Sequence, residues 1–139
     1  MMTVALNPEE LFGSLKPGEE LCLRVQGNSM SPFLKNGRDT VVLTKPVRLK
    51  KGAVVVFRRG GMFIMHRVIS VNGDVFCALG DNLSSPETDI PVGNAVAMVK
   101  AVVRKGKKLT PHSPTWLFYS KVFTIPAVRK LIRKSAARR

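Results

Sequence analysis

The sequence is poor in several features, and each shortage excludes a class of protein. Its 139 residues include two cysteines, too few for a disulfide-stapled scaffold. There is no apolar run of about 18 residues, so the sequence predicts no membrane-spanning helix. The first ten residues have neither a basic n-region nor an apolar core, so we expect no secretory signal peptide and a cytoplasmic location. Because metal-ligand spacings and Gly-rich phosphate loops are also missing, the sequence implies no metal and no other cofactor.

The two cysteines lie in segments where apolar residues alternate. We expect Cys22 and Cys77 to be buried free thiols, which fits a reducing compartment. The alternative is a Cys22–Cys77 disulfide between facing strands.

Acidic residues are unevenly distributed. All nine lie within residues 1–89, together with 11 of the Lys and Arg residues, whereas residues 90–139 contain 12 Lys and Arg and no acid. The formal net charge of +14 therefore comes mainly from the C-terminal third. Such a block is typical of a solvated or phosphate-seeking arm rather than of a core.

The length predicts one domain with its own core. We divide it into an N-terminal helical extension at 1–20, a β core at 21–108 and a basic aromatic tail at 109–139. In the extension, Asn7, Pro8 and two glutamates are typical of a short helix start.

The core sequence alternates as strands do. Strands are predicted over 21–25, 40–43, 53–57, 62–71, 74–79 and 95–103, with Asn72-Gly73 as a hairpin turn. The continuous apolar run 53–57 indicates a strand buried on both faces. The fold class is therefore mainly β, with short terminal helices.

One turn is unusual. Gly27–Pro32 places Ser29 between a glycine, which permits a sharp bend, and a proline, which stiffens the chain. A rigid, aimed hydroxyl is what a nucleophile requires. From the turn alone, an ordinary β-turn is the commoner interpretation.

The turn is followed by further motifs in a recognisable order: Asn36–Asp39, Val54–Phe57, His66–Val68 and Leu79–Asn82. In this order and spacing they resemble the serine-peptidase superfamily that contains signal peptidase I and the self-cleaving domain of LexA-type repressors. The resemblance covers about residues 21 to 105. It implies a LexA/signal-peptidase-like complex β fold.

The resemblance also implies roles. Ser29 matches the nucleophile and His66 the general base, where many relatives carry Lys and the endoplasmic-reticulum-type branch carries His. By alternation, His66 shares a strand face with Ile64 and Val68, while Arg67 points the other way. His is suited to this role because its ordinary pKa, near 6.5, already lies close to neutrality.

A third group should orient the histidine, and three acids are candidates. Asp81 belongs to the Gly-Asp-Asn box, whereas relatives of the His type place the acid several residues later, which points to Glu87 or Asp89. Each could equally be a turn residue that caps local backbone.

The remaining site residues come from the serine turn. Gly27 stands where signal peptidases usually have a serine that helps to bind the oxyanion. The Ser29 amide would therefore carry most of that work, helped by Asn28. The resemblance assigns Met30 and Pro32 to the substrate groove.

The tail allows three interpretations. Pro126 could begin a basic amphipathic helix that touches a membrane surface, or this helix could pack on the core. Binding to nucleic acid through phosphates is the least favoured.

The sequence predicts a serine endopeptidase that cuts an extended peptide segment, at most peripherally associated with the inner face of a membrane. The alternatives are a module that cleaves only itself and a degenerate peptidase fold that binds peptides. Residues 1–20 show no helix-turn-helix pattern, which disfavours a DNA-binding repressor.

Overall fold

The computed structural model describes residues 8–125 and confirms the mainly β class. Two α-helices and a short 3-10 helix accompany the strands: α1 (Pro8–Gly13), η1 (Val92–Asn94) and α2 (Pro114–Val122). The strands are β1 (Glu20–Arg24), β2 (Asp39–Thr44), β3 (Val54–Arg59), β4 (Met62–Asn72), β5 (Val75–Leu79), β6 (Glu87–Pro91), β7 (Ala95–Arg104) and β8 (Lys107–Leu109).

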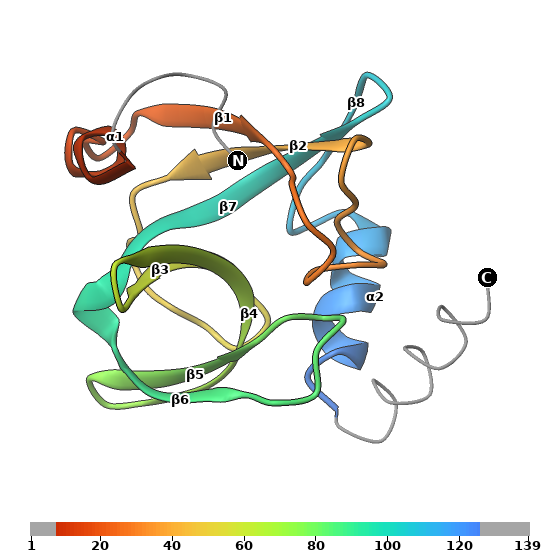
Figure 1. The fold of residues 1–139 in the computed structure, drawn as a ribbon. Helices are drawn as coiled ribbons and strands as arrows, with labels where there is room; N and C mark the ends of the chain where they lie inside the picture. The colour runs from red at the N-terminus through yellow and green to blue at the C-terminus, as the bar shows by residue number, and fades with distance from the viewer. Residues whose placement is uncertain (1–7, 126–139) are drawn as a thin grey trace.

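All eight strands form one antiparallel sheet in the order β1-β2-β7-β3-β4-β5-β6, with β8 paired to β7. The sheet is strongly curled, so β3 to β6 coil round one another while β1, β2 and β7 extend away from them (Figure 1). β7 joins the two parts, because it pairs with β2 along most of its length and with β3 at its beginning. Register shifts in β2, β3, β4 and β5 accompany this curvature.

β3 supplies side chains to both hydrophobic cores. Val54 and Val56 belong to the core under β1, β2 and β7, whereas Val55 and Phe57 belong to the core inside the coil of β3 to β6. These four side chains are nearly inaccessible to solvent. The prediction of a strand buried on both faces is therefore confirmed.

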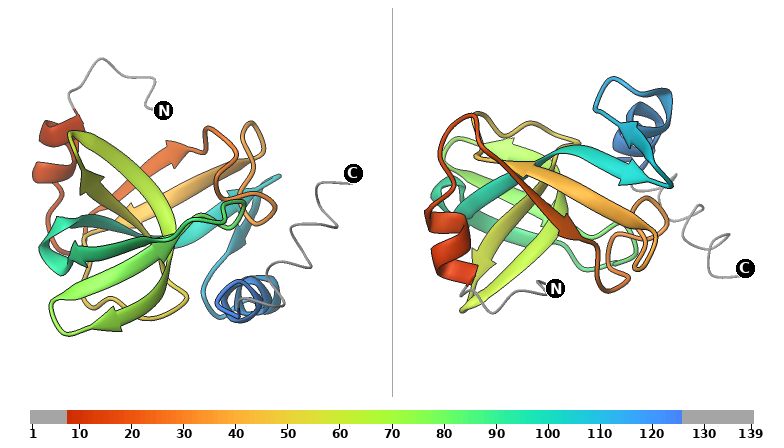
Figure 2. Two further views of the ribbon diagram at one scale, coloured as in Figure 1. Left: turned by 60° about the horizontal axis from the view of Figure 1, so that its bottom comes forward. Right: turned by 90° about the horizontal axis from the view of Figure 1, so that it is seen from above.

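The helices lie at opposite ends of the sheet (Figure 2). α1 buries Phe12 in the first core, and α2 buries Trp116 in the same core. In α2 the structure adds an element that the sequence did not predict, and Pro114 occupies the first turn of this helix. The helix predicted from Pro126 lies outside the described residues. None of the helices in the described part of the chain is long and apolar enough to span a membrane.

The expectation of two buried cysteines was wrong. Both thiols are free, but Cys22 is exposed and Cys77 is partly buried. For Cys22 the reason is that β1, at the edge of the sheet, leaves one of its faces to solvent.

A buried carboxylate fixes the start of β2. Asp39 accepts hydrogen bonds from Arg104 at 2.8 Å, from Arg38 at 2.9 Å and from the Lys35 amide at 2.8 Å. Burial alone would raise the pKa of Asp39, but the hydrogen bonds from Arg104, Arg38 and Lys35 outweigh it and hold the pKa below its ordinary value.

This carboxylate makes the stability of the fold pH-dependent. Because the folded pKa is lowered, the stabilisation is present above the unfolded pKa of about 3.9 and is lost as pH falls through the folded pKa. We expect Asp39→Asn to lower the free energy of unfolding at pH 7 by about 2 kcal/mol. Urea unfolding of the variant should also depend less on pH below about pH 4.

The control is Asp74→Asn, which changes an exposed acid in the β4–β5 turn. It should leave both the stability at pH 7 and its acid dependence close to those of the wild type. An acid dependence in Asp39→Asn equal to that of the wild type would contradict the assignment.

Candidate functional site

The serine turn follows β1 and is held by its own backbone. Gly27 has a φ of +78°, a conformation that side chains disfavour. The Ser31 amide then donates to the Asn28 carbonyl at 3.1 Å, and the Leu34 amide donates to the Met30 carbonyl at 2.9 Å. The Ser31–Pro32 peptide bond is cis. Ser29 is partly exposed and lies in a loop that these backbone hydrogen bonds close.

Apolar side chains and two arginines anchor the turn below Ser29. Met30, Phe33 and Leu34 are almost completely buried in the first core. The Phe33 carbonyl accepts hydrogen bonds from Arg38 at 2.9 Å and from Arg104 at 2.6 Å. The arginines that bind Asp39 thus also hold the end of the serine turn.

The segment after β5 closes over the serine turn. The Asn82 amide donates to the Ser29 carbonyl at 2.9 Å. A Cβ placed on Gly80 would lie 2.5 Å from the Ser29 carbonyl oxygen and 3.1 Å from Cδ2 of His66. Ser29 and His66, 37 positions apart in the sequence, therefore both lie next to Gly80.

His66 lies on β4 opposite Val55 and is 5 % exposed. Its ring packs edge-on against Phe57 at a centroid distance of 6.0 Å. Nδ1 lies 3.3 Å from Oε1 of Glu87, the first residue of β6, and Glu87 in turn forms an ion pair with Arg59 of β3. The histidine therefore has a carboxylate on its Nδ1 side.

The other two candidate acids are placed differently. Asp81 is buried and binds Arg67, with Nε–Oδ1 at 2.8 Å and Nη2–Oδ2 at 2.7 Å. Asp89 is exposed on β6 and has a φ of +54°. Of the three acids proposed from the sequence, Glu87 is the one that the structure brings to the histidine ring.

Arg67 links four parts of the chain around the site. Besides Asp81, its guanidinium donates to the Gly52 carbonyl at 2.9 Å and to Ser120 of α2 at 3.2 Å. It also lies over the Phe33 ring at 5.0 Å from the centroid. Because Arg67 follows His66 directly, the strand that carries the histidine is tied to the segment that closes over Ser29.

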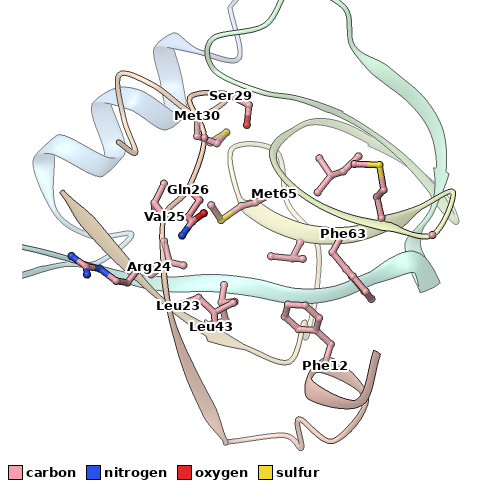
Figure 3. A pocket seen from close by; sticks show the side chains of 16 residues that line it. Phe12, Leu23, Arg24, Val25, Gln26, Ser29, Met30, Leu43, Phe63 and Met65 are labelled. Atoms are coloured by element: carbon pink, nitrogen blue, oxygen red, sulfur yellow. The ribbon is translucent and has the colours of Figure 1, made fainter. Parts of the chain in front are cut away.

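A groove of about 540 Å³ extends from the serine turn towards α1, with Ser29 and Met30 at one end and Phe12 at the other (Figure 3). The end of β1 forms one wall and residues 61–65, at the start of β4, form another. Of the predicted groove residues, Met30 lines it and Pro32 is not among its lining residues. Most of the lining is apolar, including Phe12, Leu23, Met30, Leu43, Phe63 and Met65.

Several residues of this site were missed by sequence reasoning. Arg59 was not among the predicted site residues, and the groove residues Phe63 and Met65 were predicted only as part of the strand over 62–71. The alternation of β4 does place Phe63 and Met65 on one face, but it does not show that this face is open. Nothing in the sequence links Arg59 to Glu87, because their contact depends on how the sheet curls.

The described residues contain no group of three or more His, Cys, Asp or Glu side chains arranged to hold a metal ion. The chemistry available at the site is that of a hydroxyl, an imidazole and a carboxylate.

The close approach at Gly80 gives a direct test of this geometry. We expect Gly80→Ala to destabilise the fold by about 1–3 kcal/mol, because its Cβ would press on the Ser29 carbonyl and on Leu83. NMR resonances of Ser29 and His66 should shift together. Gly93→Ala is the control, since a Cβ there meets nothing within 4 Å. Equal unfolding temperatures for the two variants would contradict this packing.

Comparisons with known proteins agree with the superfamily expected from the motifs. A comparison with curated proteins finds no match. The family model described as Peptidase S24-like matches residues 3–103, a segment that includes the serine turn, His66 and Glu87. The match spans well over half of the sequence, and the chain belongs to the Peptidase S24-like family.

Proposed function

We propose that this protein is a serine endopeptidase that cuts an extended peptide segment, with Ser29 as nucleophile and His66 as general base. Membership of the family supports a peptidase-type hydrolase. The Ser–His pairing, which resembles the endoplasmic-reticulum-type branch of the superfamily, is our own assignment.

The observation that carries the proposal is the position of Glu87 beside His66. A carboxylate 3.3 Å from Nδ1 favours the tautomer in which Nδ1 bears the proton. Nε2 is then the nitrogen that can accept a proton from a hydroxyl. The carboxylate also stabilises the imidazolium that forms during the reaction.

The reaction follows from these positions. As Nε2 of His66 accepts the hydroxyl proton, Oγ of Ser29 bonds to the scissile carbonyl carbon and an oxyanion forms. When the intermediate collapses, the C–N bond breaks and His66 gives the proton to the leaving amine. A water molecule then attacks the acyl-serine, again with His66 as base, which frees the new carboxyl end and Ser29.

The oxyanion needs donors that are already in place. Within residues 8–125 the Ser29 amide takes part in no backbone hydrogen bond, so it is available to the developing charge. Gly27 and Asn28 set the direction of this amide, because the left-handed conformation at Gly27 bends the chain just before it. The exposed Asn28 side chain is a candidate second donor.

Two strand edges beside the groove suit an extended substrate. β1 is an edge strand that pairs with β2 alone, and β4 pairs with β5 from Arg67 onward, which leaves Met62–His66 without a partner strand on that side within the described residues. An extended peptide can add its backbone hydrogen bonds to such edges.

The groove also indicates what the substrate presents. Side chains of an extended peptide alternate, so every second one points into the apolar lining formed by residues such as Leu23, Met30 and Met65. We therefore expect apolar residues at alternate positions on one side of the scissile bond.

The first test is cleavage of a diverse peptide library by the wild type and by Ser29→Ala. We expect the substitution to lower kcat by at least about 10³-fold, since it removes the group that forms the covalent bond. Ser31→Ala, in the same turn, is the matched control and should stay within a few fold of the wild type. Mass spectrometry of the peptides and of the intact protein is the readout.

The outcomes separate the candidate functions. The proposal is supported if Ser29→Ala abolishes peptide cleavage and Ser31→Ala retains it. Cleavage confined to the protein's own chain would indicate a self-processing module. Peptide binding without any cleavage, unchanged by Ser29→Ala, would overturn the proposal in favour of a peptide-binding module.

A second test separates the candidate acids. We expect Glu87→Gln to lower kcat by about 10²-fold or more, because an amide neither fixes the imidazole tautomer nor stabilises the imidazolium as a carboxylate does. Asp89→Asn makes the same chemical change two residues away and should retain activity. Unfolding temperatures of both variants should stay near that of the wild type. Loss of activity in Asp89→Asn with activity kept in Glu87→Gln would refute the assignment.

A further inference from the structure

A second surface combines exposed residues of α2 with the connector between β2 and β3. A cleft of about 590 Å³ separates the helix from the connector between β2 and β3, and its lining includes Val47, Ala53, Met98 and Leu117. Large apolar side chains stand exposed here. Val47 is 94 % exposed on the connector, and Leu117 and Phe118 are 45 % and 55 % exposed on the helix. Apolar groups placed in solvent in this way point to a binding partner.

Cations lie on both segments that carry these apolar side chains. Arg48, Lys50 and Lys51 line the connector side of the cleft, and Lys121 is exposed on α2, one turn from Leu117 and Phe118. Neither segment contains an acid, since the sequence has none between residues 40 and 73 and none after residue 89. The surface therefore carries cations that no acid of its own segments neutralises.

We propose that this surface, formed by Val47, Arg48, Lys50, Lys51, Leu117, Phe118 and Lys121 and called here the α2 surface, docks on a bilayer that contains anionic lipid. Aliphatic and aromatic side chains can enter the boundary between headgroups and acyl chains, while cations beside them bind lipid phosphates. Each exposed Lys or Arg near such a surface contributes about fivefold to binding.

The sequence that follows α2 has the same composition, rich in cations and without acids. The described chain ends at Ile125, which follows α2 and is 47 % exposed. Residues 126–139 then contain six more Lys and Arg and no acid. Cations thus occur both on the α2 surface and in the sequence that follows it, which favours an extended anionic partner over a small ligand held in the cleft.

The exposed apolar residues decide between a bilayer and nucleic acid. Duplex nucleic acid is held mainly by hydrogen bonds from cations and polar groups to its phosphates and sugars, and an exposed valine and leucine donate none. A bilayer uses both kinds of side chain. The chemistry of the α2 surface therefore fits lipid better.

The α2 surface is connected to the candidate active site through the helix itself. The inner side of α2 holds Trp116 against Phe33, which follows the serine turn, and Ser120 against Arg67. The same helix that presents apolar residues to solvent is therefore packed against the frame of the serine turn (Figure 1).

The test measures sedimentation of the full chain with vesicles. We expect binding to phosphatidylcholine vesicles that contain about one third phosphatidylserine, and little binding to pure phosphatidylcholine. Two double variants, Lys50→Glu/Lys51→Glu and Leu117→Ser/Phe118→Ser, should each weaken binding at least about tenfold. Lys16→Glu/Lys107→Glu changes net charge equally at exposed positions outside the α2 surface and should weaken binding far less. The catalytic variant Ser29→Ala should bind as the wild type does, so this test is independent of peptidase activity.

Each outcome is decisive for the α2 surface. Failure of the wild type to bind anionic vesicles would overturn the proposal. Equal loss in Lys50→Glu/Lys51→Glu and Lys16→Glu/Lys107→Glu would show general charge attraction and would also overturn it. A third outcome would assign the surface to nucleic acid instead. In that case the protein binds a DNA duplex, and Leu117→Ser/Phe118→Ser changes neither DNA binding nor vesicle binding.

Discussion

The buried ion pair between Arg67 and Asp81 is the contact on which the site depends. Both side chains are fully inaccessible to solvent, so each would be costly to bury alone, and removing one partner of such a pair typically costs about 3–5 kcal/mol. The pair joins β4 to the segment after β5. Gly80 and Asn82, on either side of the aspartate, contact the Ser29 carbonyl. His66 precedes the arginine. The ion pair thus ties the strand that carries His66 to the segment that contacts Ser29.

Asp39 plays a similar part at the other end of the serine turn. Through Arg38 and Arg104 it is linked to the Phe33 carbonyl, while the Phe33 ring lies under the Arg67 guanidinium. The turn is thus held at its start by the closing segment after β5 and at its end by arginines bound to a buried carboxylate. Hydrogen bonds at low dielectric tolerate little displacement, which gives the turn a defined position. The groove beside it, by contrast, is lined by Met and Leu side chains that can adapt to a ligand.

The sequence predicted what depends on local pattern. Alternation located β1, β2, β4, β5 and β7, and placed His66 on a strand, but it did not predict β6 or β8. A continuous apolar run indicated that β3 is buried on both faces, and the motifs identified the family. The sequence did not predict features that depend on how distant strands are arranged. The choice of Glu87 among three acids depends on where β6 lies, and the exposure of Cys22 depends on β1 being an edge strand. The contact of Arg38 with the buried Asp39 likewise could not be predicted from the sequence. The catalytic roles of Ser29 and His66 stay predictions.

α2 shows how one short helix can serve two purposes. Its inner side packs Trp116 into the core and brings Ser120 to Arg67, whereas its outer side leaves Leu117 and Phe118 in solvent beside lysines. Gly52 allows the close approach, since a Cβ there would lie 3.3 Å from the Ser120 side chain in a backbone conformation with a φ of +96°. Any displacement of α2 would therefore act on the Gly52 turn and on Arg67, which donates hydrogen bonds to both Gly52 and Ser120. Arg67 also binds Asp81, in the segment after β5 that contacts Ser29. The α2 surface and the candidate active site are therefore connected through Arg67.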